Sequence, residues 1–156
     1  YDIGLGIPAD PLFRSSYKID GWKYRPTDQQ YVENKGVYDN PKYYNQKTGE
    51  IIWPPNHGAI EGTEKIITLE PGTMMDRFGD DMGSYTAPID TPYEQRALAP
   101  GTNEKPYSKV EVIKPIEGVE EGQVAPWFDQ PGKGTQYVLP KSVEYYIDKG
   151  YIRRIK

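Results

Sequence analysis

A chain of 156 residues with 16 glycines, 15 prolines and 13% aromatic residues, mostly tyrosine, is long enough for one domain and favours a turn-rich β protein over a helical bundle. The net charge of −4, with both signs interspersed, provides no basic stripe and argues against nucleic acid as a partner. The absence of cysteine excludes disulfides, thiol nucleophiles and thiolate metal ligands, and a single histidine excludes most histidine-based metal clusters.

The first segment, residues 1–50, is rich in Tyr, Asn, Asp, Gly and Pro and lacks a sustained helical or strand period. We interpret it as a loop-rich N-terminal segment that packs its aromatic side chains on the following domain or leads into it as a tethered linker. Those side chains are Tyr17, Trp22, Tyr24, Tyr31, Tyr38, Tyr43 and Tyr44. The chain starts without a methionine and shows neither a signal-peptide pattern nor an apolar run of the ~20 residues that a membrane span needs. We therefore expect a piece of a longer polypeptide.

Residues 51–156 carry the patterns of the main domain. Four β-branched or aromatic runs bounded by Gly and Pro predict short strands of one curved sheet system, namely KIITLE, KVEVIKPIE, QVAPWF and TQYVL. TPYE, Thr91 to Glu94, has the N-cap, first-position proline and third-position glutamate of a short helix. SVEYYIDKG predicts a helix that is capped by Ser142 and ends at Gly150, and YIRRI then predicts a last strand. The predicted fold class is α+β, with strands dominant.

Several patterns that carry chemistry in other proteins are weak in this sequence. GKGTQY lacks the third glycine and the lysine–serine pair of phosphate-binding loops, and is more consistent with a turn that delivers Gln136 to the start of a strand. His57 lies in WPPNHG, a rigid turn that favours a structural residue over a catalytic one. The adjacent acids at 80–81 are typical of a solvated turn, and their spacing does not require Ca²⁺.

Four blocks between Ile51 and Ile155 resemble, in order, the NAD glycohydrolase toxin domain family typified by tuberculosis necrotizing toxin. They are IIWPPNHG, PGTMMDRFGDDMGSYTAP with TPYEQRAL behind it, YSKVEVIKPI, and GQVAPWFDQPGKGTQYVLP with its SVEYYIDKGYIRRI tail. The blocks extend over about two thirds of the chain, and their combination is far more specific than any single motif.

The resemblance implies a small β-rich domain over residues 51–156, in which a curved antiparallel sheet with a few short helices forms a cleft for NAD. It implies hydrolysis of the bond between nicotinamide and ribose, which depletes NAD in a target cell. NAD⁺ or NADP⁺ is then the substrate, and neither a cofactor nor a metal is expected. The family's setting implies a secreted polypeptide that acts in the cytoplasm of a competing cell and is neutralised by a cognate immunity protein. Nucleic acid and a membrane span are not expected.

The resemblance also assigns site residues at the matching positions. Arg77 and Gln136 are the principal ones, because a guanidinium can grip phosphates or ribose and a neutral amide can orient the carboxamide of nicotinamide or an attacking water. The implied substrate-binding residues are Tyr85, Arg96, Ser108, Phe78 and Trp127. Ser108 departs from the family, whose bacterial members typically carry a histidine after the tyrosine. Slow turnover is expected if catalysis needs that histidine, whereas a serine with a bound water can replace a group that only positions substrate.

Each assignment has a structural alternative, and the function has two. The structural alternatives are an ion pair of Arg77 with Asp76 or Asp81, a core tyrosine at Tyr85, a surface charge at Arg96, a polar ladder residue at Gln136, and a core pair at Trp127 and Phe128. An ADP-ribosyltransferase would break the same bond but hand ADP-ribose to a macromolecule. A non-catalytic nucleotide- or protein-binding module would keep the fold without turnover.

Overall fold

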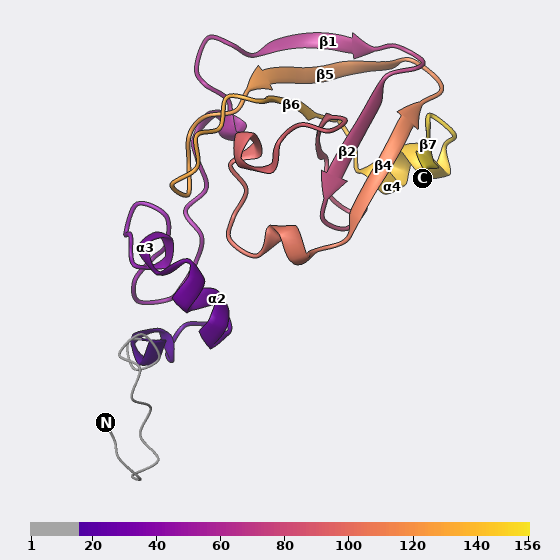
Figure 1. Ribbon diagram of the computed structural model, residues 1–156. Helices are drawn as coiled ribbons and strands as arrows, with labels where there is room; N and C mark the ends of the chain where they lie inside the picture. Colours follow the sequence, from indigo (N-terminus) through magenta and orange to yellow (C-terminus); the bar gives the residue numbers. More distant parts are fainter. Residues whose placement is uncertain (1–15) are drawn as a thin grey trace. The chain divides into compact units, whose positions relative to one another are not determined.

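The computed structural model describes residues 16–156 of the chain. Backbone contacts divide the protein into two compact units, Tyr1–Trp53 and Pro54–Lys156. The described part of the first unit consists of short helical segments and turns, whereas the second unit contains every strand of the described chain (Figure 1).

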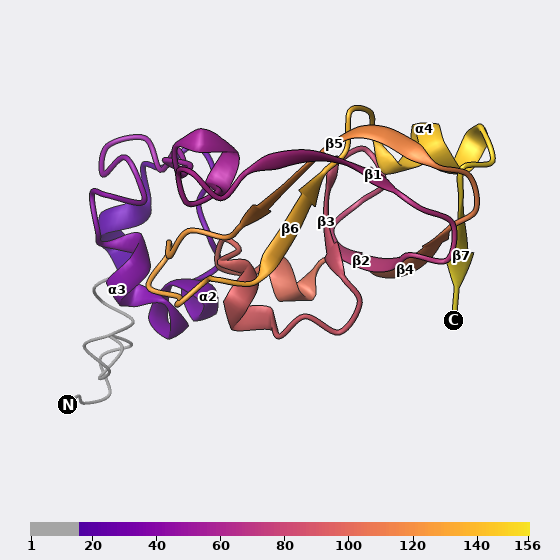
Figure 2. The same ribbon diagram turned by 90° about the horizontal axis from the view of Figure 1, so that it is seen from above.

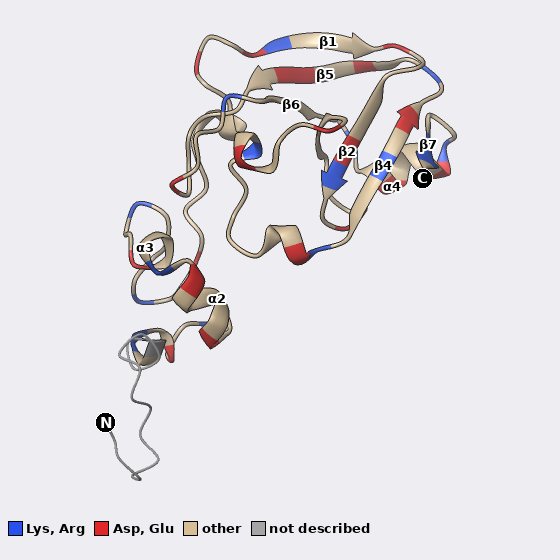
Figure 3. Cartoon of the chain, viewed as in Figure 1, with Lys and Arg blue, Asp and Glu red and all other residues tan. Residues whose placement is uncertain are grey.

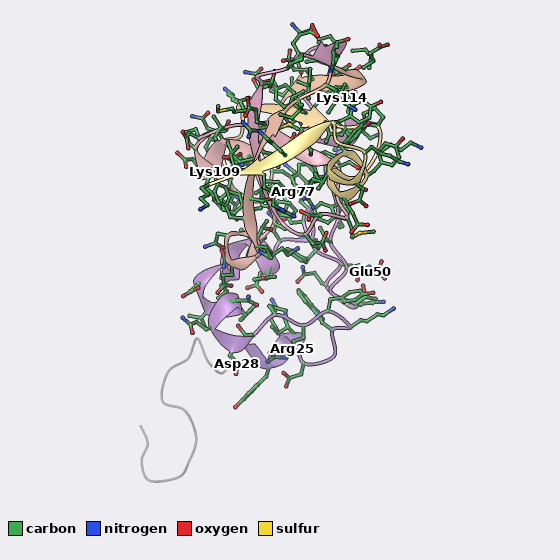
Figure 4. All side chains as sticks on the ribbon, turned by 90° about the vertical axis from the view of Figure 1, so that its right-hand side faces the viewer. Arg25, Asp28, Glu50, Arg77, Lys109 and Lys114 are labelled. Atoms are coloured by element: carbon green, nitrogen blue, oxygen red, sulfur yellow. The ribbon has the colours of Figure 1, made fainter. Side chains whose placement is uncertain are left out.

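The described part of the first unit contains three helical segments: η1 (Ser16–Ile19), α2 (Asp28–Glu33) and α3 (Lys35–Tyr38). α2 begins at a capping box, in which Thr27 Oγ1 accepts a hydrogen bond from Gln30 N at 3.1 Å and Gln30 Oε1 accepts one from Thr27 N at 3.0 Å. Ahead of α2, Arg25 pairs with Asp28 at 2.7 Å (Figure 4). These helices were not predicted, although TDQQ is a capping-box signature.

Aromatic side chains form the core of this first unit. The buried ones are Trp22, Tyr31, Tyr38, Tyr43 and Tyr44, whereas Tyr17 and Tyr24 are exposed. Trp22 stacks on Tyr44 with ring centroids 5.9 Å apart, and Tyr38 lies 4.8 Å from Tyr44. The rings therefore provide the buried apolar area that a short segment with few aliphatic residues needs in order to stay compact.

The second unit is built on one antiparallel sheet. Its strands are β1 (Lys65–Leu69), β2 (Met74–Phe78), β3 (Tyr85–Pro88), β4 (Tyr107–Val112), β5 (Ile116–Gln123), β6 (Thr135–Val138) and β7 (Ile152–Ile155). They lie in the order β1-β5-β6-β3-β2-β4-β7. Figures 1 and 2 show a curled sheet, in which β2 and β4 run across the direction of β5 and β6. The strand-dominated α+β class and the curved sheet are confirmed.

Most predicted strands occupy their predicted places, but two predictions need correction and two strands were not predicted. KIITLE, TQYVL and YIRRI form β1, β6 and β7, but KVEVIKPIE divides between β4 and β5 at a turn. QVAPWF is not a strand: Gln123 ends β5 and Val124 makes only an isolated bridge to Ala59. β2 and β3 were not predicted, because their short runs include an aspartate, an arginine and a proline, which are uncommon in strands.

Short helical segments connect the strands of the second unit. They are η2 (Asn56–Gly58), η3 (Tyr93–Arg96), η4 (Thr102–Glu104) and α4 (Val143–Asp148). The helix predicted at TPYE is a 3₁₀ turn that begins at Tyr93, and Thr91 does not cap it. The hydroxyl of Thr91 instead donates to the carbonyl oxygen of Pro88 at 2.6 Å, as expected for a threonine that closes a local turn.

The hydrophobic core lies against one face of the sheet and under α4. It contains Leu69, Met75, Val110, Val112, Ile116, Val119, Tyr137, Leu139, Val143, Tyr146 and Ile152. Val119 and Tyr137 alternate along their strands with Glu120 and Gln136. The carboxylate of Glu120 and the amide of Gln136 therefore point to the opposite face. The core thus fixes which strand residues are available to form a polar site.

Helix α4 is capped as predicted, which allows a stability test. Ser142 Oγ accepts a hydrogen bond from Tyr145 N at 3.1 Å, and Gly150 has φ +76° beyond the helix. Ser142→Ala is expected to lower the free energy of unfolding by about 1 kcal/mol, measured by urea denaturation. Ser142→Asp keeps an acceptor and is expected to stay within about 0.5 kcal/mol of the wild type. Equal stability of all three proteins would contradict the capping role.

Charged segments of both signs are scattered over the described chain, and β5 carries several acidic positions (Figure 3). This distribution provides no continuous basic track for a nucleic acid backbone. Among residues 16–156, no helix combines the length and apolar character required to cross a membrane.

Candidate functional site

A concave pocket opens in the second unit, where β6, β3 and β2 lie side by side. Its lining residues are Asp76, Arg77, Phe78, Tyr85, Thr86, Ala87, Arg96, Leu98, Val124, Thr135 and Gln136. The pocket brings together five of the residues assigned from the resemblance: Arg77, Phe78, Tyr85, Arg96 and Gln136. The other two, Ser108 and Trp127, do not line it.

Arg77 holds the loop between β2 and β3 against the pocket. Its Nε donates to the carbonyl oxygen of Asp80 at 2.7 Å and its Nη1 donates to that of Tyr85 at 2.9 Å. Figure 4 shows Arg77 amid the side chains of the second unit. Burial lowers the pKa of Arg77, and the charges of Asp80 and Asp81 oppose that change. The group remains a cation at neutral pH, with N–H groups left over for a ligand.

The ion pair that the sequence left open for Arg77 is formed by another arginine. Arg96 Nη1 lies 2.7 Å from Asp76 Oδ1, and both side chains are buried, with exposures of 7% and 0%. Arg96 Nε and Nη2 both donate to the carbonyl oxygen of Thr91, at 3.0 and 2.8 Å. Asp76 Oδ2 accepts from the hydroxyl of Tyr107 at 2.6 Å and from Asp90 N at 3.1 Å. Arg96 is thus an anchored pocket residue rather than a surface charge.

Aromatic rings surround this ion pair. The guanidinium carbon of Arg96 lies 5.0 Å from the ring centroid of Phe78, within the range of a cation–π contact. Phe78 in turn lies 5.2 Å from Tyr93 and 4.7 Å from Tyr107. Burial and the hydrogen bond to Asp76 raise the pKa of Tyr107 to about 12, so its hydroxyl remains a donor at neutral pH.

Gln136 is the residue of β6 that lines the pocket with a side-chain amide, next to Thr135. It is 9% exposed, and its Nε2 donates to the carbonyl oxygen of His57 at 2.9 Å. The GKGTQY turn delivers it to the second residue of β6, as predicted. The facing position on β5 is Gly122, where a Cβ would lie 2.9 Å from that of Ala59. A small residue there allows the 57–59 turn to approach Gln136.

Tyr85, Glu120 and Gln136 share one face of the sheet. Tyr85 and Glu120 both pair with Val138 in the strand register, and Gln136 lies two residues from Val138. Burial raises the pKa of Tyr85, and the charge of Glu120 adds to the effect. The carboxylate of Glu120 lies 3.1 Å from Nδ1 of His57, whose side chain is 70% exposed. Glu120 does not line the pocket, and neither its partner nor its face can be deduced from the sequence without the register.

Ser108 and Trp127 occupy other positions. Ser108 on β4 lies opposite Arg77 on β2 in the strand register, but it does not reach the pocket. Trp127 forms an isolated bridge with Gln130 and an edge-to-face contact with Phe128 at 6.5 Å. Phe128 is buried, and neither ring lines the pocket.

The place of Arg77 depends on a residue without a side chain. A Cβ added to Gly83 would lie 1.9 Å from Arg77 Nη2, so the guanidinium would have to move. Gly83→Ala is expected to lower the free energy of unfolding by about 1–3 kcal/mol in urea denaturation. At Gly21 no atom of residues 16–156 lies within 4 Å of an added Cβ, and Gly21→Ala is expected to change stability by about 0.5 kcal/mol at most. Equal effects of the two substitutions would contradict the packing argument.

The fold and the pocket define a small β-rich domain whose cleft combines two guanidinium groups, an amide, aromatic rings and aliphatic side chains. Residues 68–155 match the family described as Tuberculosis necrotizing toxin. That range is more than half of the 156 residues and contains every residue that lines the pocket. The chain belongs to this family, as the resemblance of its motifs implied.

One sequence relative and one solved structure are similar to this chain. It is 40% identical over 119 residues to the conidial surface nicotinamide adenine dinucleotide glycohydrolase of Aspergillus fumigatus, a match that covers 69% of this chain and 50% of the relative. The chain thus spans about half the length of that relative. The solved structure of tuberculosis necrotizing toxin complexed with its immunity factor has a TM-score of 0.61 and 24% identity, and the match covers 92% of this chain and 82% of that one. The two share a fold.

Proposed function

We propose that this domain is an NAD glycohydrolase, which cleaves the bond between nicotinamide and ribose of NAD⁺ or NADP⁺. The observation that carries the proposal is that the residues of the pocket all fall within the range matched to the necrotizing toxin family. The 40% identity to a protein named as an NAD glycohydrolase supports the same activity. The pocket chemistry fits, because a dinucleotide offers flat rings, hydrogen-bonding hydroxyls and negative phosphates.

The reaction needs orientation and charge stabilisation more than a nucleophilic side chain. When the glycosidic bond breaks, its electron pair passes to the ring nitrogen, so the pyridinium leaves as neutral nicotinamide. The ribosyl centre becomes an oxocarbenium-like cation, a water adds to it, and that water releases a proton. Holding the rings, the phosphates and the water in place supplies much of the rate. No step requires the thiol that this chain lacks.

The pocket residues divide these tasks by their chemistry. Gln136 is the candidate catalytic residue, since its amide can contact the carboxamide or the water without a change of charge. Arg77 donates two of its N–H groups to carbonyl oxygens of its loop, and its other N–H groups can donate to a phosphate or ribose oxygen. Phe78 and Tyr85 provide ring surfaces for the base or the nicotinamide. Arg96 contributes positive charge that Asp76 partly offsets.

The biological setting is part of the proposal. A secreted polypeptide fits the conidial surface location stated for the fungal relative. Entry into the cytoplasm of a target cell would give the activity its toxic effect through loss of NAD. Neutralisation by an immunity protein and use against competing bacteria are proposals that derive from the family's typical setting. For a chain whose relative belongs to a fungus, the cell-surface role has the more direct support.

The test is the disappearance of NAD⁺ with the purified domain, with NADP⁺ tested in parallel and the products separated by chromatography. Stoichiometric nicotinamide and free ADP-ribose are expected. The reaction is repeated with NAD⁺ labelled in the adenosine moiety in the presence of a cell lysate. Label on protein or nucleic acid would show transfer instead of hydrolysis. No loss of NAD⁺ by a folded protein that binds the nucleotide would indicate a binding module, and would overturn the proposal.

A further inference from the structure

The turn before β1 has a strained backbone next to the pocket. Asn56, His57 and Gly58 all have left-handed conformations, with φ of 57°, 55° and 87°. Such conformations are uncommon outside glycine, although asparagine and histidine tolerate them better than most residues. The surrounding structure holds the turn in place: Ala125 N donates to the carbonyl oxygen of Gly58 at 2.8 Å, and Asn56 Nδ2 donates to Glu64 Oε2 at 3.0 Å. Strain retained in this way is often found at functional sites.

The strained turn presents the backbone carbonyl of His57 to the side chain of Gln136. Gln136 Nε2 lies 2.9 Å from that oxygen. Because a carbonyl oxygen can only accept, the contact fixes which end of the amide is nitrogen. Gln136 Oε1 accepts no hydrogen bond from residues 16–156, and it is not one of their fully buried, unpaired atoms. Oε1 is therefore the amide atom that the pocket offers to a ligand.

We propose that the backbone carbonyl of His57 is a positioning group for Gln136, which holds the amide so that Oε1 accepts a hydrogen bond from the substrate or from the attacking water. The inference deepens the proposed function and rests on it, since it assigns an acceptor role to the amide of that same site. The imidazole has a separate place, because it is exposed and lies 3.1 Å from Glu120. The positioning thus depends on the backbone conformation of His57 and not on its side chain.

The experiment compares two substitutions that both remove the imidazole. His57→Asn keeps a residue that tolerates the left-handed conformation, whereas His57→Val introduces a β-branched residue that strongly disfavours it. We expect kcat for NAD⁺ cleavage to be at least roughly tenfold higher in the asparagine variant than in the valine variant, with a smaller difference in KM. Glu120→Gln weakens the contact to the imidazole and serves as a third variant. Its kcat for NAD⁺ cleavage is expected to resemble that of His57→Asn. Thermal unfolding establishes a temperature at which all variants are folded.

Two activity results would overturn the inference. Equal kcat values of the asparagine and valine variants would show that the backbone conformation at 57 does not matter. Activity restored to the valine variant by added imidazole would assign the function to the side chain.

A second readout does not depend on catalysis. In the wild type and in His57→Asn, one side-chain amide proton of Gln136 should exchange slowly with solvent by NMR, and in His57→Val it should exchange fast. The signal is assigned by its absence in Gln136→Ala. If the wild type cleaves no NAD⁺, the proposed function fails, yet the amide exchange still decides whether the turn positions Gln136. Fast exchange in the wild type would overturn the positioning role even in an active enzyme.

Discussion

Replacement of Gln136 by alanine is expected to lower kcat for NAD⁺ cleavage by roughly 100-fold or more while the domain stays folded. The side chain is the amide of the pocket, and its Oε1 is open to a ligand. Alanine removes that acceptor and leaves the carbonyl of His57 without its donor, which costs about 1–3 kcal/mol of stability. Kinetics on purified protein, with folding checked by circular dichroism, measures the effect.

Gln123 provides a matched control for this substitution. Its Nε2 also donates to a backbone carbonyl, that of Lys133 at 3.3 Å, but it is exposed and does not line the pocket. Gln123→Ala is expected to keep kcat within roughly twofold of the wild type. Near-normal turnover by a folded Gln136→Ala protein would remove Gln136 from the catalytic role, whereas an equal loss in both variants would indicate a general effect on the sheet.

The sequence supports strong predictions where the signal is local. The cap at Ser142 and the stop at Gly150 define α4, and both depend on neighbouring residues alone. The β-branched runs likewise predict β1, β6 and β7. β2 escapes prediction because Asp76 is charged in isolation and fits a strand interior only after pairing with Arg96. The identity of that partner, 20 positions along the chain, is a tertiary property.

The candidate site shows the same division between local and tertiary information. Arg77 and Gln136 were assigned from family motifs, and the sheet order brings their strands close together. The motifs do not show which acceptor each side-chain N–H group of Arg77 and Gln136 contacts. The sequence cannot show that Arg77 holds the carbonyls of its own loop, nor that the carbonyl of His57 meets the amide of Gln136. The contact between His57 and Gln136 joins residues that are 79 positions apart, so it exists only in the folded domain.

The buried ion pair carries the largest expected effect on stability. Asp76→Ala should lower the free energy of unfolding by about 3–5 kcal/mol, because it leaves the cation of Arg96 buried without its counter-charge. The substitution also removes the acceptor of the Tyr107 hydroxyl and of Asp90 N. Urea denaturation at neutral pH measures the change. Glu111→Ala, which breaks the exposed ion pair with Arg153, is expected to cost about 0–1 kcal/mol.

A double substitution separates stability from activity. Asp76→Leu combined with Arg96→Met removes both charges, so it avoids the penalty of one unpaired ion, and buried pairs replaced in this way often lose little stability. We therefore expect the double variant to be more stable than Asp76→Ala and yet to cleave NAD⁺ at least roughly tenfold more slowly than the wild type, because the pocket loses a cation. Wild-type activity in a stable double variant would assign the pair to folding alone. A double variant no more stable than Asp76→Ala would show that losing the hydrogen bonds from Arg96 to Thr91 costs as much stability as leaving Arg96 without its counter-charge.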